Sequence, residues 1–175
     1  MVEQMKSPRI SAAYRGADFE DELKTTHEDY QRRGLAVVTK HEVRKVRRRD
    51  GTVIYAQKSI SDFTGILAGG RFVAFDAKSL RRPTLTWKPD ARQLHQLLYL
   101  RQVAALGGIA FYLVRNGIDE ARIVAPDAVA EGQRVDLSTC PRVDRTFSST
   151  PWDWLTVVQR LFANSLQPPP QAPAT

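Results

Sequence analysis

The stretch "SDFTGILAGGRFVAFDAKS", residues 61–79, decides the fold. Residues 72–75 in its second half are apolar at every position, and because side chains alternate along a strand, this predicts a central strand covered on both faces. Residues 68–70, Ala-Gly-Gly, predict a turn that joins this strand to the one before it. The stretch is therefore read as a β-hairpin in the middle of a sheet.

Three charged residues interrupt this hairpin where a sheet would normally bury apolar side chains: Asp62, Asp76 and Lys78. An isolated carboxylate at the end of a buried strand costs several kcal/mol unless it is paired or binds a cation. Two carboxylates from adjoining strands, with a lysine beside them, suit a divalent ion and the hydrolysis of a phosphodiester. The alternative interpretation is that Asp76 and Lys78 form a solvent-facing ion pair at a strand end, which contributes little to stability.

The segments before the hairpin alternate between helix and strand. Apolar spacing predicts a helix over 16–33, with Asp18 as its N-cap, and residues 34–40, "GLAVVTK", predict a short buried strand. Residues 43–58 predict a basic hairpin that protrudes, with Asp50-Gly51 at its turn. Residues 1–13 are expected to form a flexible N-terminal arm.

The segments after the hairpin continue the alternation. A linker over 81–89 leads to a helix from Asp90 to about Leu106, with Gln93 completing a capping box. Residues 109–114 and 122–124 predict strands, and a last helix runs to about Leu166. We expect one α/β domain over 14–166, with a mixed sheet flanked by helices, and a disordered proline-rich tail over 167–175.

Composition limits the class of protein. The chain has 175 residues, 42% of them hydrophobic, and a net charge of +7. It shows neither a membrane span nor a signal peptide, so we expect a cytoplasmic location and no membrane partner. One cysteine and three scattered histidines favour neither a disulfide nor a zinc site. The basic runs at 44–49 and 81–82 favour a polyanion such as DNA, although a solvated basic hairpin without a partner gives the same pattern.

Six ordered runs of sequence make the chain resemble a known family. Asp62 followed by Asp76-Ala77-Lys78 resembles the PD-(D/E)xK nuclease signature. The runs at 61–65, 71–79, 95–96 and 107–111, with "YRGADFE" and "GLAVVTK" upstream, resemble the RecU family of Holliday junction resolvases over residues 14–115. The resemblance implies a restriction-endonuclease-like core and a DNA-cleaving endonuclease that acts on four-way junctions, in a phage or a bacterial recombination system.

The resemblance also implies a set of site residues. The magnesium site, which manganese also suits, would use the carboxylates of Glu20, Asp62 and Asp76 and the carbonyl of Ala77. Lys78 would orient the attacking water, Gln96 would steady the site, and Lys40 would touch the scissile phosphate. The DNA-binding residues would be Lys40, Arg44, Lys45, Arg47, Arg48, Arg49, Arg81 and Arg82.

A junction has two related strands to cut, so the resemblance implies a homodimer with branched DNA as its partner and no small-molecule cofactor. Two departures from the family stand out. Asp76 replaces the usual glutamate, which shortens the ligand by one methylene. His41-Glu42-Val43 replaces a proline-containing segment, which bears on the role of Lys40.

Other interpretations remain open at this point. Glu20 suits a helix N-terminus, and Gln96 suits a helix surface. The spacing of Gln96 and Tyr99 is one residue short of the pattern in RecB-like DNA exonucleases, which are a second candidate class. The third is a non-catalytic protein that binds DNA junctions on a nuclease scaffold. His95 is read as structural, and Trp152 and Trp154 as packing residues rather than base-stacking ones.

Overall fold

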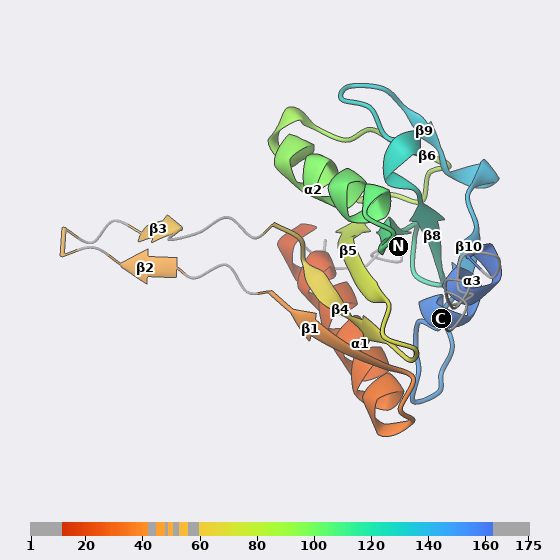
Figure 1. Ribbon diagram of the computed structural model, residues 1–175. Helices are drawn as coiled ribbons and strands as arrows, with labels where there is room; N and C mark the ends of the chain where they lie inside the picture. Colours follow the sequence, from red (N-terminus) through yellow and green to blue (C-terminus); the bar gives the residue numbers. More distant parts are fainter. Residues whose placement is uncertain (1–11, 42–44, 48, 51–52, 56–59, 163–175) are drawn as a thin grey trace, which may run out of the picture.

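A six-stranded mixed β-sheet forms the centre of the molecule (Figure 1). The computed structural model describes residues 12–41, 45–47, 49–50, 53–55 and 60–162. The sheet contains, in spatial order, β1 (Ala36–Lys40), β4 (Phe63–Leu67), β5 (Phe72–Ser79), β7 (Ile109–Arg115), β8 (Glu120–Val124) and β10 (Arg142–Asp144). Within the described ranges, no helix is both long and apolar enough to cross a membrane.

Helices cover both faces of this sheet. Helix α1 (Ala12–Arg32) packs on β1 and β5, and α2 (Leu94–Ala105) packs on β5 and β7 from the other side. Each face has its own core: Phe63, Phe75 and Phe111 stack in a row under α1, and Trp87 and Tyr112 pack under α2. A large apolar side chain buried in this way contributes about 2 kcal/mol. The expected α/β class, with a mixed sheet flanked by helices, is confirmed.

The stretch at 61–79 forms the predicted hairpin. Its turn uses Gly69 and Gly70, both with positive φ angles that other residues adopt only with strain. Strand β5 pairs antiparallel with β4 and parallel with β7, and is therefore central as predicted. Its alternate residues enter the two cores, and Asp76 lies on the α2 side with Ala74.

Helix α1 has the predicted apolar face but starts earlier than expected. Phe19, Leu23 and Tyr30 are all buried on it. The helix begins at Ala12, so the prediction that Asp18 caps it is wrong: this carboxylate lies inside the helix and pairs with Arg115. Most of the expected N-terminal arm lies outside the described residues.

The basic segment forms a separate two-stranded sheet, β2 (Lys45–Arg47) with β3 (Val53–Tyr55). Lys45 is opposite Tyr55 and Arg47 is opposite Val53, as in an antiparallel hairpin. Figure 1 shows this hairpin projecting away from the main sheet, as predicted.

Strand β1 and the segment before α2 differ from expectation. β1 is an edge strand, and its alternate side chains are exposed because they lie on the face of the sheet where α2 packs only on β5 and β7. The expected linker contains β6 (Thr86–Trp87), which pairs with β9 (Val135–Asp136). The chain then makes 3-10 turns at Ala91–Gln93, Pro126–Ala128 and Leu137–Thr139.

The start of α2 lacks the predicted capping box. The helix begins at Leu94, after the first of these 3-10 turns, and Gln93 makes no side-chain capping bond. The N–H of Gln93 instead donates to the main-chain oxygen of Asp90. Gly107, with a positive φ, follows the helix end as predicted.

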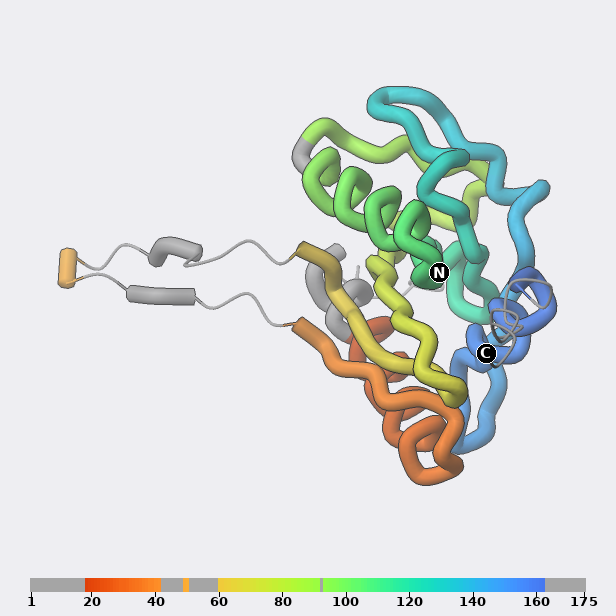
Figure 2. Tube along the Cα trace, in the orientation of Figure 1, coloured from red at the N-terminus to blue at the C-terminus, as the bar shows by residue number. Residues whose placement is uncertain are grey.

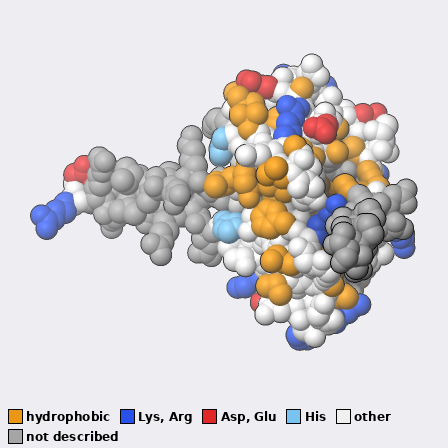
Figure 3. Space-filling model, viewed as in Figure 1, with side chains coloured by type: hydrophobic (Ala, Val, Ile, Leu, Met, Phe, Trp, Pro, Cys, Tyr) orange, Lys and Arg blue, Asp and Glu red, His pale blue; other side chains and the backbone are white. Residues whose placement is uncertain are grey.

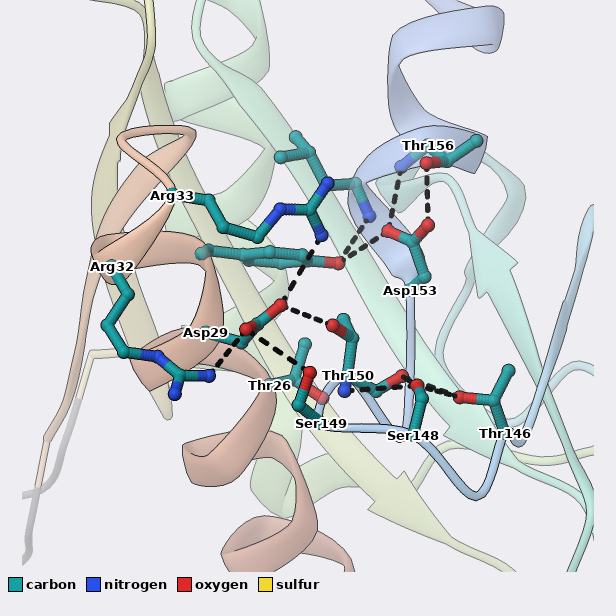
Figure 4. Close-up of polar contacts among 12 residues, drawn as sticks. Thr26, Asp29, Arg32, Arg33, Thr146, Ser148, Ser149, Thr150, Asp153 and Thr156 are labelled. Atoms are coloured by element: carbon teal, nitrogen blue, oxygen red, sulfur yellow. Dashed lines mark hydrogen bonds and ion pairs between the residues drawn. The ribbon is translucent and has the colours of Figure 1, made fainter.

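The last described segment packs against α1. Asp29 of α1 accepts hydrogen bonds from Ser149 and Thr150, which ties the helix to the loop before α3 (Trp154–Leu161) (Figure 4). In Figure 2 this blue segment lies beside the orange helix α1. Asp153 caps α3, and the helix ends at Leu161 rather than near Leu166.

Both tryptophans of this segment are packing residues, as predicted. The indole N–H of Trp154 donates to Nε2 of His27, and that of Trp152 donates to a carboxylate oxygen of Glu22. Neither indole has solvent-exposed surface, so neither is available to stack on a base or on a second subunit.

Candidate active site

Two carboxylates meet where β4 begins and β5 ends. The backbone N–H of Asp62 donates to Oδ1 of Asp76 over 2.8 Å, and the backbone N–H of Ala77 donates to Oδ2 of Asp62 over 3.0 Å. Each carboxylate is thus fixed by the neighbouring strand. The structure brings together the two aspartates that the sequence pattern singled out.

This pair is costly to keep charged. Asp76 has no exposed surface. Burial raises the pKa of both carboxyl groups, and the charge of Asp76 raises that of Asp62 further, whereas the ammonium of Lys78 opposes the shift in both. Among the described atoms, Oδ2 of Asp76 is buried without a hydrogen-bond partner. An unsatisfied carboxylate oxygen of this kind favours a cation close by.

Lys78 supplies the nearest positive charge. Its Nζ lies 3.4 Å from Oδ2 of Asp76 and 3.7 Å from Oδ2 of Asp62. It also donates to Oε1 of Gln96 over 3.3 Å. Gln96 belongs to α2, so this helix, which packs on the same face of the sheet, restricts the position of the lysine. The interpretation of Gln96 as an ordinary surface amide is therefore wrong.

Glu20 and Lys40 form a second, separate pair. Oε2 of Glu20 lies 2.8 Å from Nζ of Lys40, and both side chains are about 30% exposed. Glu20 lies within α1 rather than in its first turn, so it does not act on the helix N-terminus. Among the described residues, no group of three or more His, Cys, Asp or Glu side chains is arranged to hold a metal ion. The structure therefore does not join Glu20 to the two aspartates.

The residues expected to bind DNA fall on two segments. Lys45 and Arg47 lie in β2, and Arg49 is exposed at the end of the projecting hairpin, where Figure 3 shows basic side chains. Two exposed residues follow β5 directly after the carboxylate cluster, Arg81 and Arg82. The remaining two of the expected set, Arg44 and Arg48, lie outside the described residues.

Two neighbours of the cluster were not predicted to belong to it: Tyr112 was overlooked, and His95 was expected to be structural only. Tyr112 of β7 is the register partner of Asp76, and the pKa of its hydroxyl is raised by burial and then by the Asp76 charge. His95 opposes the rise in the pKa of Asp76, after the larger effect of Lys78. The parallel pairing of β5 with β7 would have placed Tyr112 beside Asp76, but a sequence alone does not fix that register.

Comparisons with known proteins agree with this geometry. Residues 14–125 match the family model described as "RecU: Recombination protein U". The chain is 33% identical over 120 residues to a Holliday junction resolvase RecU of Geobacillus kaustophilus, covering 63% of this chain and 59% of that protein. It is 26% identical over 177 residues to one of Streptococcus thermophilus, covering 95% and 85%.

The chain covers different shares of the lengths of these relatives. For the Geobacillus kaustophilus protein and that of Geobacillus thermodenitrificans, the chain spans less than two thirds of the relative's length, 59% and 57%. Among solved structures, the Holliday junction resolvase Hjc of Archaeoglobus fulgidus aligns with 15% identity and a TM-score of 0.45, covering 71% of this chain and 85% of that one. The family-model match extends over more than half of the chain and includes the whole carboxylate cluster, so this protein belongs to the RecU family.

Proposed function

We propose that this protein is a structure-selective endodeoxyribonuclease that resolves four-way DNA junctions by metal-dependent, paired hydrolysis of phosphodiesters. The observation that carries the proposal is the cluster of Asp62, Asp76 and Lys78, in which a half-buried carboxylate, a fully buried one and an ammonium meet at the ends of adjoining strands. Relatives described as Holliday junction resolvases support the choice of substrate.

The donor set fits a hard divalent cation, for which we propose magnesium with manganese as a substitute. Asp62 and Asp76 supply two carboxylates, and Oδ2 of Asp76 makes no hydrogen bond among the described atoms, with only the Lys78 ammonium 3.4 Å away. The carbonyl of Ala77 would be a further ligand, as would Glu20 once it separates from Lys40. The ion, when bound, stabilises negative charge on the phosphate and favours deprotonation of water.

The side chains around this cation have distinct proposed roles. Lys78 orients the attacking water in line with the phosphorus and offsets the charge that develops on the phosphate. Gln96 is a positioning residue, because it holds the ammonium of Lys78 rather than the substrate. Lys40, at the end of β1, would contact the scissile phosphate.

Binding of the junction falls to the basic segments. The hairpin formed by β2 and β3, with Arg81 and Arg82, would contact phosphates, which provides affinity and orientation but no reading of sequence. Each chain has one carboxylate cluster, and paired incision needs two, so we propose a homodimer. The DNA substrate also agrees with the expected cytoplasmic location.

The decisive experiment compares a labelled four-way junction with a linear duplex of the same sequence, in magnesium and in EDTA. We expect symmetric nicks in the junction alone, in magnesium alone. Asp76→Asn should reduce the rate by at least about a hundredfold. Asp127→Asn is the matched control, because it makes the same change at an exposed site outside the cluster.

Other outcomes point to the other two classes. Digestion that begins at the ends of the linear duplex would indicate a RecB-like exonuclease. A junction that is bound but stays intact in magnesium and in manganese would indicate a non-catalytic binding protein and refute the proposed roles of Asp76 and Lys78.

A further inference from the structure

The end of strand β1 brings a histidine beside the carboxylate cluster. Lys40 is the register partner of Phe63, and the backbone N–H of the next residue, His41, donates to the main-chain oxygen of Asp62 over 2.8 Å. His41 therefore continues the pairing of β1 with β4 and lies directly opposite Asp62. Residues that oppose each other in this way project their side chains from the same face of a sheet. The imidazole and the carboxylate are thus neighbours on one face.

The preceding residue, Lys40, projects from the other face. Side chains alternate along a strand, so Lys40 points toward α1, where its Nζ pairs with Glu20. His41 points instead toward the face that carries the carboxylate cluster. The two residues would therefore approach a DNA strand from opposite faces of the sheet.

A threonine of β4 holds the histidine ring. Nε2 of His41 lies 2.6 Å from Oγ1 of Thr64, which projects from the same face two residues after Asp62. A hydroxyl can donate to a ring nitrogen, and the other nitrogen of a neutral imidazole then carries the proton. With Thr64 as the donor, Nδ1 of His41 has an N–H, and no hydrogen bond joins it to any described residue.

This side of the sheet is open to a DNA strand. Helix α2 packs on β5 and β7 and leaves the same face of β1 and β4 uncovered, where Val37 and Ile66 are more than half exposed. The side chain of His41 is exposed as well, and Figure 3 shows histidine side chains at the surface near the base of the projecting hairpin. Along the chain, His41 lies between the hairpin and β1, and in space it lies beside the carboxylate cluster.

The chemistry of the ring favours a phosphate as its partner. A hard ion such as magnesium prefers oxygen ligands, so the imidazole is a poor further ligand for the proposed cation. Phosphate oxygens accept hydrogen bonds from neutral polar side chains as well as from lysine and arginine. A lysine at this position would pair with Asp62, whereas a neutral N–H group stays available to the substrate.

We propose that Nδ1 of His41 donates a hydrogen bond to a phosphate of the cleaved strand next to the scissile one, and that Thr64 is a positioning residue that sets the tautomer of the ring. The scissile phosphate would lie at the cation, and His41 lies one strand spacing, about 4.8 Å, further toward the edge of the sheet. The inference rests on the proposed function, because it needs a DNA strand that crosses the carboxylate cluster. It goes further by assigning a substrate contact to a residue where this chain departs from the family pattern.

Fluorescence anisotropy of a labelled four-way junction in EDTA tests the contact without cleavage. His41→Leu should weaken binding about tenfold, because a hydrogen bond to a charged group is lost. His41→Asn should bind more tightly than His41→Leu, because its amide nitrogen takes the position of Nδ1. A His41→Leu protein that melts at the wild-type temperature and binds as tightly as wild type would overturn the proposal.

Neutral phosphate substitutes locate the contact on the DNA. Junctions are made with one methylphosphonate at a time along the strand near the branch point. One position should weaken wild-type binding about tenfold and should not weaken the binding of His41→Leu further, because its partner side chain is already missing. If every position affects the two proteins equally, His41 contacts no phosphate.

Substitutions at Thr64 test the positioning role. Thr64→Val removes the hydroxyl with little change of shape, so it should reduce the effect of that methylphosphonate, and Thr64→Ser should restore the effect. Thr39→Val is the matched control, because Thr39 is the register partner of Thr64 on the same face but does not hold the ring. Equal effects of Thr64→Val and Thr39→Val would show that Thr64 does not position His41.

Cleavage kinetics separate failure of this contact from failure of the proposed function. A contact made equally in the bound state and in the transition state affects KM alone, so His41→Leu should raise KM about tenfold and leave kcat nearly unchanged. If wild type cuts the junction and His41→Leu cuts it with the same KM, the contact is wrong and the activity stands. If wild type shows the selective methylphosphonate effect but cuts no junction, the contact stands and the activity is wrong.

Discussion

The proposed chemistry needs a negative charge on Asp76, and that charge lowers the stability of the folded chain. Burial raises the pKa of this carboxyl group, so its charged form is costly in the folded chain at neutral pH. Asp76→Asn removes the charge with little change of shape. We expect the variant in EDTA to melt a few degrees above wild type, and magnesium to raise the melting temperature of wild type alone.

Thermal unfolding followed by far-UV circular dichroism, with and without magnesium, measures both effects. Asp127→Asn should behave as wild type in each condition, because it changes an exposed carboxylate. A variant that melts below wild type in EDTA would show that the Asp76 carboxylate stabilises the fold and that its charge is already compensated.

His27 makes the stability of the fold depend on pH. Its Nε2 accepts the indole N–H of Trp154, and burial lowers its pKa to about 3. The unfolded chain binds a proton below about pH 6.5, which the folded chain does not, so stability falls as the pH falls. Well below pH 6.5, this loss approaches about 1.4 kcal/mol per pH unit until the folded-state pKa is reached.

Urea unfolding between about pH 6.5 and pH 4 measures this slope. His27→Gln retains an acceptor for Trp154 but does not titrate, so it should lose stability less steeply than wild type. Equal slopes for His27→Gln and wild type would assign the acid sensitivity to other groups.

The sequence predicted site residues correctly where the alternation of side chains along a strand was enough to place them. Asp62, Asp76 and Lys78 lie together because the hairpin at 61–79 is a local structure whose register follows from its turn. Glu20 was expected beside them and instead pairs with Lys40. Contacts between distant segments depend on packing geometry, which the spacing of residues along the chain does not determine.

Among the separate elements, the projecting hairpin gives the clearest DNA prediction. We expect the triple substitution of Arg47, Arg48 and Arg49 by alanine to weaken junction binding and to flatten its dependence on salt. Each lost phosphate contact should reduce the slope of log K against log salt by about one. Fluorescence anisotropy across a salt series measures both quantities.

A control of equal charge separates local contact from net charge. Alanine substitutions at three exposed arginines of the main body remove the same three charges: Arg134, Arg142 and Arg160. They should shift affinity only slightly. Equal effects of the two triple variants would remove the hairpin from the binding site.

Element boundaries were predicted less well than element types. The strands at 63–67, 72–79 and 109–115 agree closely with their patterns, because continuous apolar runs are strong signals. Strand β1 was expected to be buried and is an edge strand, since its sequence does not reveal its neighbours. The capping box predicted at Asp90 does not form, because the chain makes a 3-10 turn at this point instead.

At the scale of the whole molecule, the proposed dimer predicts a dominant effect of an inactive partner. Wild type mixed with excess Asp76→Asn should convert a plasmid cruciform mainly to nicked circles rather than linear DNA, because most active subunits then have an inactive partner. Gel electrophoresis distinguishes the two products. Mainly linear products in the first mixture would contradict paired action.

For the molecule as a whole, the sequence predicted the fold class but not the detailed arrangement of the strands. The alternation of helices and strands indicated a mixed sheet between helices, and that was confirmed. The β6–β9 pair and strand β10 escaped notice, because strands of two or three residues leave no periodic signal. The exposed face of β1 and β4 also escaped notice, since Val37 and Ile66 look like core residues in the sequence.

The order of strands across the sheet has a consequence for synthesis at the ribosome. Along β1, β4, β5, β7, β8 and β10, each strand is added beside the one that emerged before it, so the sheet can grow from one edge as the chain lengthens. The underside of α1 is different, because Trp152 and Trp154 complete its core and are among the last described residues to be made. A nascent chain that has not reached them leaves part of the apolar face of its first helix uncovered, and the final segment covers that part.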